Sequence, residues 1–456
     1  MLSVPAARPL CRLRPLGILA RPLCRLQPLG ILARPLCRVR RWSSSYSHVS
    51  ARVLEDAERS SSGLPGPSLP ALLELTKVLP PQPVSILMLR AAARDQSSEN
   101  RLRQAQFILR ELIARRAHIL TLLHEIERSK QQRWVVVRPA VHELAQIFWG
   151  RLKRLLATPE PETEDQRARF VEDCIVANQD IAKLTIPAET HWTLVGLDAL
   201  QKEHGPDWWK SDPEARVTID RQLDAIFLAR IGLRFLLEHY LACEEQREGF
   251  TGILETNCSP VQVCHEVAAE TEAQLLAEFG AHPPIEVVGD ASKTFTYVPK
   301  HIRKVVGTLL KNSGVATLRH QHLMKQRTGG DVGAPIAPVR CIVAVSDETV
   351  QIKLADEAGG IRRSSLINVW SYRSLESSWW RPVDGISLPL ARLYCQYFGG
   401  SISMIPMEGY GTDCYVTLNR LAHANSEQII PVPATHISDG GGLLDVRPIP
   451  QPLADH

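Results

Sequence analysis

The chain has 456 residues, which is long enough for two domains and additional terminal segments. Its content of 44% hydrophobic and 22% charged residues is ordinary for a globular protein, and no apolar run is long enough to predict a transmembrane helix. The formal net charge of +4 arises at the N-terminus, because residues 1–54 contain ten arginines and neither a lysine nor an acidic residue. The remaining 43 basic and 49 acidic residues sum to −6, so no basic face for nucleic acid is indicated.

An arginine-rich repeat occupies the N-terminus. Residues 10–22 are followed by a near copy at residues 23–35, and a third copy begins at residue 36. Positive charge with interspersed leucine, no acidic residue and a following serine cluster are typical of a mitochondrial transit peptide. We therefore predict that residues 1–50 form a transit peptide and that the protein is located in the mitochondrial matrix. A disordered basic tail is the alternative.

The ten cysteines show no CxxC pair and no Cys/His spacing that is typical of a zinc site. Buried free thiols in a reducing compartment are therefore the favoured interpretation.

The first half of the remaining chain is predicted to be helical. Residues 62–83 are rich in proline and glycine, which indicates a loop-rich lead-in. Between residues 85 and 250, apolar residues recur at helical spacing in three stripes, and proline-containing breaks separate them. Long helices with polar breaks predict an antiparallel helix bundle over residues 85–250.

Helices and strands are intermixed in the second half, over residues 256–424. Ser259 is predicted to cap a helix that has Pro260 in its first turn and ends before Gly280. The predicted elements in chain order are helix 260–279, strand 285–288, helix 299–320, strands 340–345 and 350–354, helix 388–398, and a hairpin of strands 401–406 and 412–418. This order predicts an α+β sandwich. Residues 425–456 show no periodicity and are predicted to be a flexible C-terminal tail.

Three short stretches in the C-terminal third carry a family resemblance: residues 310–312 (LKN), 356–360 (DEAGG) and 407–413 (MEGYGTD). With residues 229–236 (ARIGLRFL) and 388–394 (LPLARLY), they form an ordered set that resembles the mitochondrial 2-oxo-acid dehydrogenase kinases. This family comprises pyruvate dehydrogenase kinase and branched-chain 2-oxo-acid dehydrogenase kinase. The resemblance implies an N-terminal antiparallel helix bundle followed by a GHKL-type α/β sandwich that binds ATP.

The resemblance also implies a nucleotide site with ATP and Mg²⁺ as cofactors. Asn312 would hold the Mg²⁺ that bridges the phosphates, and Asp356 would accept a hydrogen bond from the adenine amino group. The simpler interpretations are a surface asparagine on a helix and an acidic residue in a turn. The residues implied to bind the nucleotide are Asn312, Asp356, Gly359, Gly360, Gly385, Leu388, Gly411 and Thr412.

The sequence departs from the family pattern at positions that matter for catalysis. Thr308 occupies the position of the family's glutamate base, and a neutral hydroxyl cannot usefully accept a proton near neutral pH. Ala358 replaces a glycine, only Gly385 remains of the second glycine-rich motif, and residues 361–384, where the ATP lid is expected, contain no glycine. The catalytic residues therefore stay unassigned.

Two functions remain open on the sequence alone. The first is an active serine kinase that phosphorylates the E1 subunit of a pyruvate or branched-chain dehydrogenase complex and inhibits it. The second is a pseudokinase that senses nucleotide or acts as a scaffold on the complex. The expected partners in both cases are the E1 subunit and the lipoyl-bearing E2 subunit, and a homodimer is left open. His239 on a bundle helix is interpreted as structural.

Overall fold

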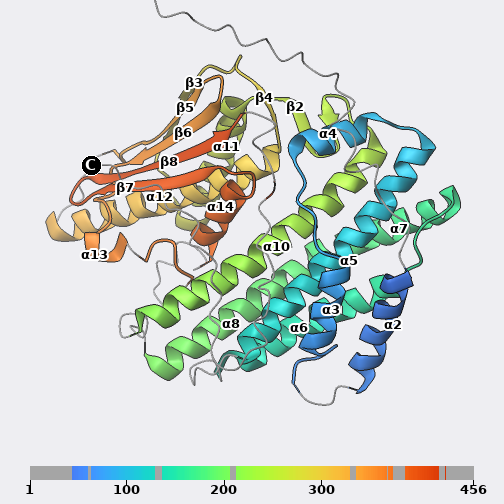
Figure 1. Ribbon diagram of the computed structural model, residues 1–456. Coiled ribbons are helices and arrows are strands. Elements are labelled where there is room, and N and C mark those ends of the chain that lie inside the picture. The colour runs from blue at the N-terminus through green and yellow to red at the C-terminus, as the bar shows by residue number, and fades with distance from the viewer. Residues whose placement is uncertain are drawn as a thin grey trace, which may run out of the picture.

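The computed structural model describes residues 44–59, 63–128, 136–205, 212–328, 335–366, 368–372, 386–420 and residue 427. Helices fill the described chain up to residue 245, and helices and strands alternate after it (Figure 1). The mixed α+β class that the sequence predicts is therefore confirmed. None of the helices in these ranges combines the length and the apolar character that a membrane span requires.

Long helices pack side by side in the N-terminal part (Figure 1). They are α5 (Ser98–Arg128), α6 (Arg138–Leu156), α7 (Glu164–Asp180), α8 (Ile186–His204) and α10 (Pro213–Glu245). The π-helical turn Ile181–Thr185 joins α7 to α8, and the short helix α4 (Ile86–Arg94) lies beside β1. Helix α5 lies between α6 and α10, and it is buried on most sides along its second half. Local sequence sets the helix starts: Thr163 forms a capping box with Gln166, and Asp212 accepts the backbone N–H of Ala215.

Two helices precede the predicted bundle. Residues 62–83 were predicted to be loop-rich, but α3 (Leu69–Val78) lies within them and packs against α2 (Ser44–Arg59). The prediction was wrong because Pro70 lies in the first turn of α3, where a missing N–H costs nothing. Tyr46 and Val49 are buried in the core, so the predicted boundary at residue 50 falls inside α2.

The C-terminal part is built on a five-stranded sheet with the order β3-β5-β6-β8-β7. Strands β3 and β5 are parallel, and the other neighbours are antiparallel. Helices α11, α12 and α14 pack on one face of the sheet. The strands of this sheet are β3 (Ile285–Gly289), β5 (Val339–Val345), β6 (Thr349–Asp356), β7 (Ser401–Met407) and β8 (Gly411–Asn419). The helices are α11 (Pro260–Phe279), α12 (Pro299–Thr328) and α14 (Ser387–Gln396). A second sheet contains β1 (Phe250–Thr251), β2 (Leu254–Cys258) and β4 (Phe295–Tyr297).

Helix α11 confirms the predicted helix over residues 260–279 at both ends. The hydroxyl of Ser259 accepts the N–H of Gln262, and Gly280 ends the helix with φ = 72°. Helix α12 continues two turns beyond the predicted end at residue 320, because no proline or glycine interrupts the sequence before residue 329. The described cysteines are free and buried, as predicted; they are Cys174, Cys243, Cys258, Cys264, Cys341, Cys395 and Cys414.

Aromatic side chains join the helical part to the sandwich. Helix α10 packs against α14, and the ring of Phe235 lies 5.4 Å from that of Tyr397 and 5.1 Å from that of Phe398. Residues from both parts belong to one continuous hydrophobic core. The sandwich is therefore held directly against α10.

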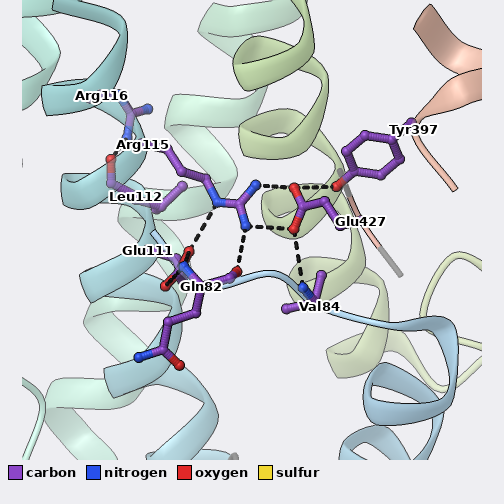
Figure 2. A network of polar contacts seen from close by, with 8 residues as sticks. All are labelled: Gln82, Val84, Glu111, Leu112, Arg115, Arg116, Tyr397 and Glu427. Atoms are coloured by element: carbon purple, nitrogen blue, oxygen red, sulfur yellow. Dashed lines mark hydrogen bonds and ion pairs between the residues drawn. The ribbon is translucent and has the colours of Figure 1, made fainter. Parts of the chain in front are cut away.

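A buried ion pair ties a residue of the predicted tail to this junction. Figure 2 shows Glu427 between Arg115 of α5 and Tyr397, which lies at the end of α14. The Glu427 carboxylate accepts hydrogen bonds from Arg115 Nη2 at 2.7 Å and from the Tyr397 hydroxyl at 2.8 Å. Its backbone N–H donates to the carbonyl of Val84. The predicted flexible tail over residues 425–456 is thus incorrect at Glu427, because a buried guanidinium fixes this carboxylate.

Candidate functional site

A buried carboxylate lies at the end of strand β6. Asp356 is 7% exposed and pairs in register with Thr412 at the start of β8. Its Oδ1 accepts the backbone N–H groups of Ala358 at 3.1 Å and of Thr412 at 3.2 Å, and its Oδ2 accepts the hydroxyl of Ser313 at 2.9 Å. Burial raises the pKa of Asp356, and the three hydrogen bonds oppose this shift. Because a carboxylate has about four acceptor positions, Asp356 can accept a further donor.

Two glycine-containing loops meet beside Asp356. The N–H of Gly359 donates to the carbonyl of Tyr410, and the N–H of Gly409 donates to the carbonyl of Gly359. A Cβ atom on Gly360 would lie 2.2 Å from the carbonyl oxygen of Met407.

Two further glycines at this site, Gly411 and Gly359, also have close neighbours. A Cβ on Gly411 would lie 1.8 Å from the Asp356 carbonyl oxygen, and one on Gly359 would lie 2.8 Å from Nδ1 of His320. Gly359 and Gly360 also have positive φ angles of 81° and 71°. Close backbone approach therefore requires glycine at Gly360 and Gly411, and the positive φ favours it at Gly359, independently of any ligand.

Helix α12 brings three polar residues to one face, one turn apart. The Nδ2 of Asn312 donates to the carbonyl of Thr308 at 2.8 Å, and the Thr308 hydroxyl donates to the carbonyl of Lys304 at 2.8 Å. The first bond turns the amide nitrogen of Asn312 toward the helix, so the amide oxygen can point outward, as a hard cation requires. The second bond uses the proton of Thr308 and gives it no means of acting as a base.

Ser313 joins this helix face to the buried carboxylate. It follows Asn312 in the chain, and its hydroxyl binds Asp356. The sequence analysis missed Ser313, because its partner lies 43 residues away and no motif marks it. Helix α12 is therefore joined to the end of β6 at the residue that follows the predicted Asn312.

Two predicted site residues remain, Leu388 and Gly385. Leu388 is near the start of α14 and packs against the core. Gly385 lies outside the described residues. Six of the eight predicted positions thus gather at the β6–β8 end of the sheet and on α12, namely Asn312, Asp356, Gly359, Gly360, Gly411 and Thr412.

The segment predicted to form the ATP lid, residues 361–384, is described only as far as Tyr372. It contains the short helix α13 (Arg363–Leu366). The Tyr372 hydroxyl donates to Asp224 of α10 at 2.8 Å, and its ring stacks on Phe227 with a centroid distance of 5.6 Å. The described part of this segment is therefore anchored on the helical part of the protein.

A cation would have few protein ligands at this site. Among the residues that the structure describes, no group of three or more His, Cys, Asp or Glu side chains could hold a metal ion. Mg²⁺ commonly binds through one or two protein oxygens, with phosphates and water as its other ligands. The oriented amide of Asn312 fits this mode and does not fit a site built from protein ligands alone.

Comparisons with known proteins point to one family. The family model described as mitochondrial branched-chain alpha-ketoacid dehydrogenase kinase matches residues 83–257. A mitochondrial pyruvate dehydrogenase (acetyl-transferring) kinase of Arabidopsis thaliana is 29% identical over 370 residues, covering 76% of this chain and 92% of the relative. A kinase of the same name from Schizosaccharomyces pombe is 35% identical over 222 residues, or 44% of this chain and 50% of the relative. The mitochondrial pyruvate dehydrogenase (acetyl-transferring) kinase isozyme 4 of Mus musculus is 27% identical over 397 residues, covering 81% of this chain and 89% of the relative.

The helical part and the α/β sandwich are both covered by these matches. The chain is therefore similar to mitochondrial 2-oxo-acid dehydrogenase kinases.

Proposed function

We propose that this protein is a mitochondrial kinase of a 2-oxo-acid dehydrogenase complex. In this proposal it transfers the γ-phosphoryl group of ATP to a serine of the E1 subunit and thereby inhibits the complex. The observation that carries the proposal is the buried carboxylate of Asp356. It accepts a hydrogen bond from Ser313, the residue that follows Asn312 on α12. Support comes from the pyruvate dehydrogenase kinases that match up to 92% of their own length.

The proposal assigns a binding role to each part of the β6–β8 site. Asp356 would accept a hydrogen bond from the adenine amino group, and the backbone at Gly411 and Thr412 would contact the base. The glycine turn at Gly359 and Gly360 would let the chain pass close to the purine. The oxygen of Asn312 would hold Mg²⁺, which when bound would neutralise phosphate charge. Gly385 and Leu388 complete the proposed nucleotide site.

The domain boundaries follow from this assignment. We place the regulatory bundle at residues 85–250 and the GHKL-type sandwich at residues 256–424. We place the end of the matrix-targeting segment before residue 44, because Tyr46 and Val49 of α2 are buried in the core.

A pseudokinase is the second candidate, and the geometry of Thr308 favours it. Its hydroxyl donates to the carbonyl of Lys304, so no carboxylate stands one turn before Asn312 to accept the serine proton. Phosphoryl transfer depends mainly on positioning and charge stabilisation, so the loss of the base alone would slow the reaction without abolishing it. Such a protein would still bind nucleotide and dock on the E2 subunit.

One face of the sheet supports a homodimer. Burial alternates along β5, and side chains on the face opposite the helices are open to solvent. Apolar residues lie on this face from one edge of the sheet to the other: Val288 (59% exposed), Ile342 (42%), Ile405 (55%) and Met407 (60%). The Lys353–Asp413 ion pair lies on the same face, so the surface is mixed apolar and charged. We propose a second copy of the chain as its partner.

Phosphate transfer to isolated E1 subunits tests the kinase proposal. Radiolabelled ATP would be offered with the E1 subunit of the pyruvate or of the branched-chain complex. We expect the wild type to label one of the two E1 subunits slowly. The labelling rate should rise at least about tenfold in Thr308→Glu, since a general base accelerates a reaction by about 100- to 10,000-fold.

The matched control is Thr308→Gln, which has nearly the size of glutamate but cannot accept a proton. Labelling of neither E1 subunit by the wild type or by Thr308→Glu would favour the pseudokinase. An equal gain with glutamine would show that the new side chain acts through its shape and not as a base.

A further inference from the structure

The hydrogen bonds of Asp356 leave one of its two carboxylate oxygens with room for a ligand. Oδ1 accepts two backbone N–H groups, from Ala358 and Thr412, which fill both of its lone pairs. Oδ2 accepts the hydroxyl of Ser313 at 2.9 Å and, among the residues that the structure describes, no other donor. A donor group of a base that binds this carboxylate therefore binds Oδ2, directly beside the oxygen of Ser313.

The hydroxyl of Ser313 can change its partner. A serine hydroxyl carries one proton and two acceptor positions, and it rotates to suit its surroundings. Ser313 is 7% exposed, so its hydroxyl depends on a protein or ligand partner more than on bulk water. When a ligand donates to Oδ2 of Asp356, Ser313 can give its proton to an acceptor on the same ligand without losing a hydrogen bond.

The protein holds Ser313 and Asp356 in place from both sides. The hydroxyl of Thr317, one turn further along α12, donates to the carbonyl of Ser313 at 2.8 Å. A Cβ on Gly314 would clash with Leu275, so α12 lies close against α11 at this point. On the other side, pairing of β6 with β8 fixes the backbone of Asp356. The two side-chain oxygens therefore form a preorganised pair.

The spacing of the two oxygens decides what they can read on a base. They are 2.9 Å apart, and the two N–H bonds of one amino group diverge too widely to reach both oxygens with good geometry. The pair fits two neighbouring atoms on one edge of a base instead, with a donor facing Asp356 and an acceptor facing Ser313. Adenine has this order on its Watson–Crick edge, where the amino group adjoins the ring nitrogen N1, and guanine has the reverse order.

We infer that Ser313 is a specificity-determining residue that reads N1 of adenine while Asp356 accepts a hydrogen bond from the adjacent amino group. The hydroxyl of Ser313 turns from Oδ2 to N1, and an amino N–H takes its former place on Oδ2. Guanine would set its carbonyl oxygen against the buried carboxylate and is therefore excluded. The inference rests on the proposed nucleotide site. It goes further because it gives a base-reading role to a residue outside the motifs found in the sequence.

Affinities for nucleotide analogues test this role without phosphate transfer. Calorimetric titration of the full chain uses the Mg²⁺ complexes of ATP, of 1-deaza-ATP, which has a C–H group in place of N1, and of purine riboside triphosphate, which lacks the amino group. We expect the wild type to bind ATP about three- to tenfold more tightly than 1-deaza-ATP, the effect of one neutral hydrogen bond. Equal affinities of the wild type for these two nucleotides overturn the inference without any variant.

Ser313→Ala separates a contact with N1 from a purely structural role. We expect the preference for ATP over 1-deaza-ATP to disappear in this variant, because alanine has no proton to donate. If Ser313 only oriented Asp356, the variant would lose affinity for both nucleotides equally and the preference would persist, which overturns the inference. Purine riboside triphosphate should still bind the variant more weakly than ATP does, since the amino contact belongs to Asp356.

Ser401→Ala is the matched control. Ser401 begins β7 at the end of the sheet remote from Asp356, so the preference for ATP over 1-deaza-ATP should remain. Its loss in this control as well would overturn the assignment to Ser313.

The same titrations distinguish failure of this inference from failure of the proposed function. ATP binding without a preference over 1-deaza-ATP removes the role of Ser313 and leaves the nucleotide site in place. No binding of Mg-ATP or Mg-ADP removes the nucleotide site, and the role of Ser313 with it. Binding of Mg-GTP as tight as that of Mg-ATP would also overturn the inference, because the carboxylate would then not select an amino group.

Discussion

At the scale of single residues, glycines at the β6–β8 site are required by close contacts between backbones. The Cβ atom of an alanine at Gly411 would lie 1.8 Å from the Asp356 carbonyl oxygen, a distance that forces the two strands apart. We expect Gly411→Ala to lower the free energy of unfolding by about 1–3 kcal/mol and to abolish nucleotide binding. Thermal unfolding followed by circular dichroism measures the first effect.

Gly150→Ala is the matched control. Gly150 lies within α6, and a Cβ there would contact nothing within 4 Å. Because alanine favours a helix over glycine, this change should stabilise the protein by up to about 1 kcal/mol. Equal melting temperatures for the two variants would contradict the contact argument.

A second prediction at this scale concerns His239, which the sequence analysis interpreted as structural. Burial lowers its pKa to about 4 from the ordinary value of 6.5. Between these two values the unfolded chain binds a proton that the folded protein does not, so stability falls as the pH decreases through this range. His239→Gln should flatten the dependence of unfolding free energy on pH by up to about 1.4 kcal/mol per pH unit. Urea titrations at several pH values measure the slope, and an unchanged slope would be inconsistent with a buried neutral histidine.

Some site residues could be predicted from the sequence and others could not. Asn312, Asp356 and Thr412 belong to short motifs; Asp356 pairs in register with Thr412 and binds Ser313, the residue after Asn312. Ser313 and Glu427 were missed because their partners lie 43 and 312 residues away in the chain, a separation at which no local pattern identifies a contact. Their roles follow from the fold alone.

At the scale of helices and strands, local signals predicted many elements well. The ends of α11 follow from Ser259 and Gly280, and the β5–β6 and β7–β8 pairs follow from alternating residues. Helix α3 was missed because the prolines around it resemble a loop, although burial of Leu72 and Leu75 stabilises the helix. Packing outweighed the local sequence signal in this segment.

The open face of the five-stranded sheet carries a prediction at the same scale. Ile342→Asp places a charge on this face at β5 and should convert a dimer to a monomer, because desolvating the charge opposes association. Sedimentation velocity measures the oligomeric state. Leu323→Asp is the control, since Leu323 is a similarly exposed apolar residue on α12. A wild-type protein that sediments as a monomer would remove the homodimer proposal.

At the scale of the whole molecule, Glu427 connects segments that are distant in the chain. It binds Arg115 of the helical part and Tyr397 of the sandwich, and it also contacts the backbone of Val84 (Figure 2). Glu427→Ala would leave the buried guanidinium of Arg115 with incomplete compensation. We expect a loss of about 3–5 kcal/mol in unfolding free energy.

Chemical denaturation of Glu427→Ala and of the exposed-site control Glu248→Ala tests this prediction. The control should change stability by less than about 0.5 kcal/mol. If both variants unfold at the same denaturant concentration, the ion pair does not hold the two parts together.

The central claim is that the β6–β8 site binds an adenine nucleotide through Asp356 and Asn312. Calorimetric titration of the chain with Mg-ATP and Mg-ADP measures it most directly, with Asp356→Ala, Asn312→Ala and Gly150→Ala as the variants. The account predicts micromolar binding by the wild type and by Gly150→Ala, and loss of binding in the other two variants while their folded structure is retained. An absence of heat and of competition in the wild type, or undiminished affinity in Asp356→Ala, would contradict it.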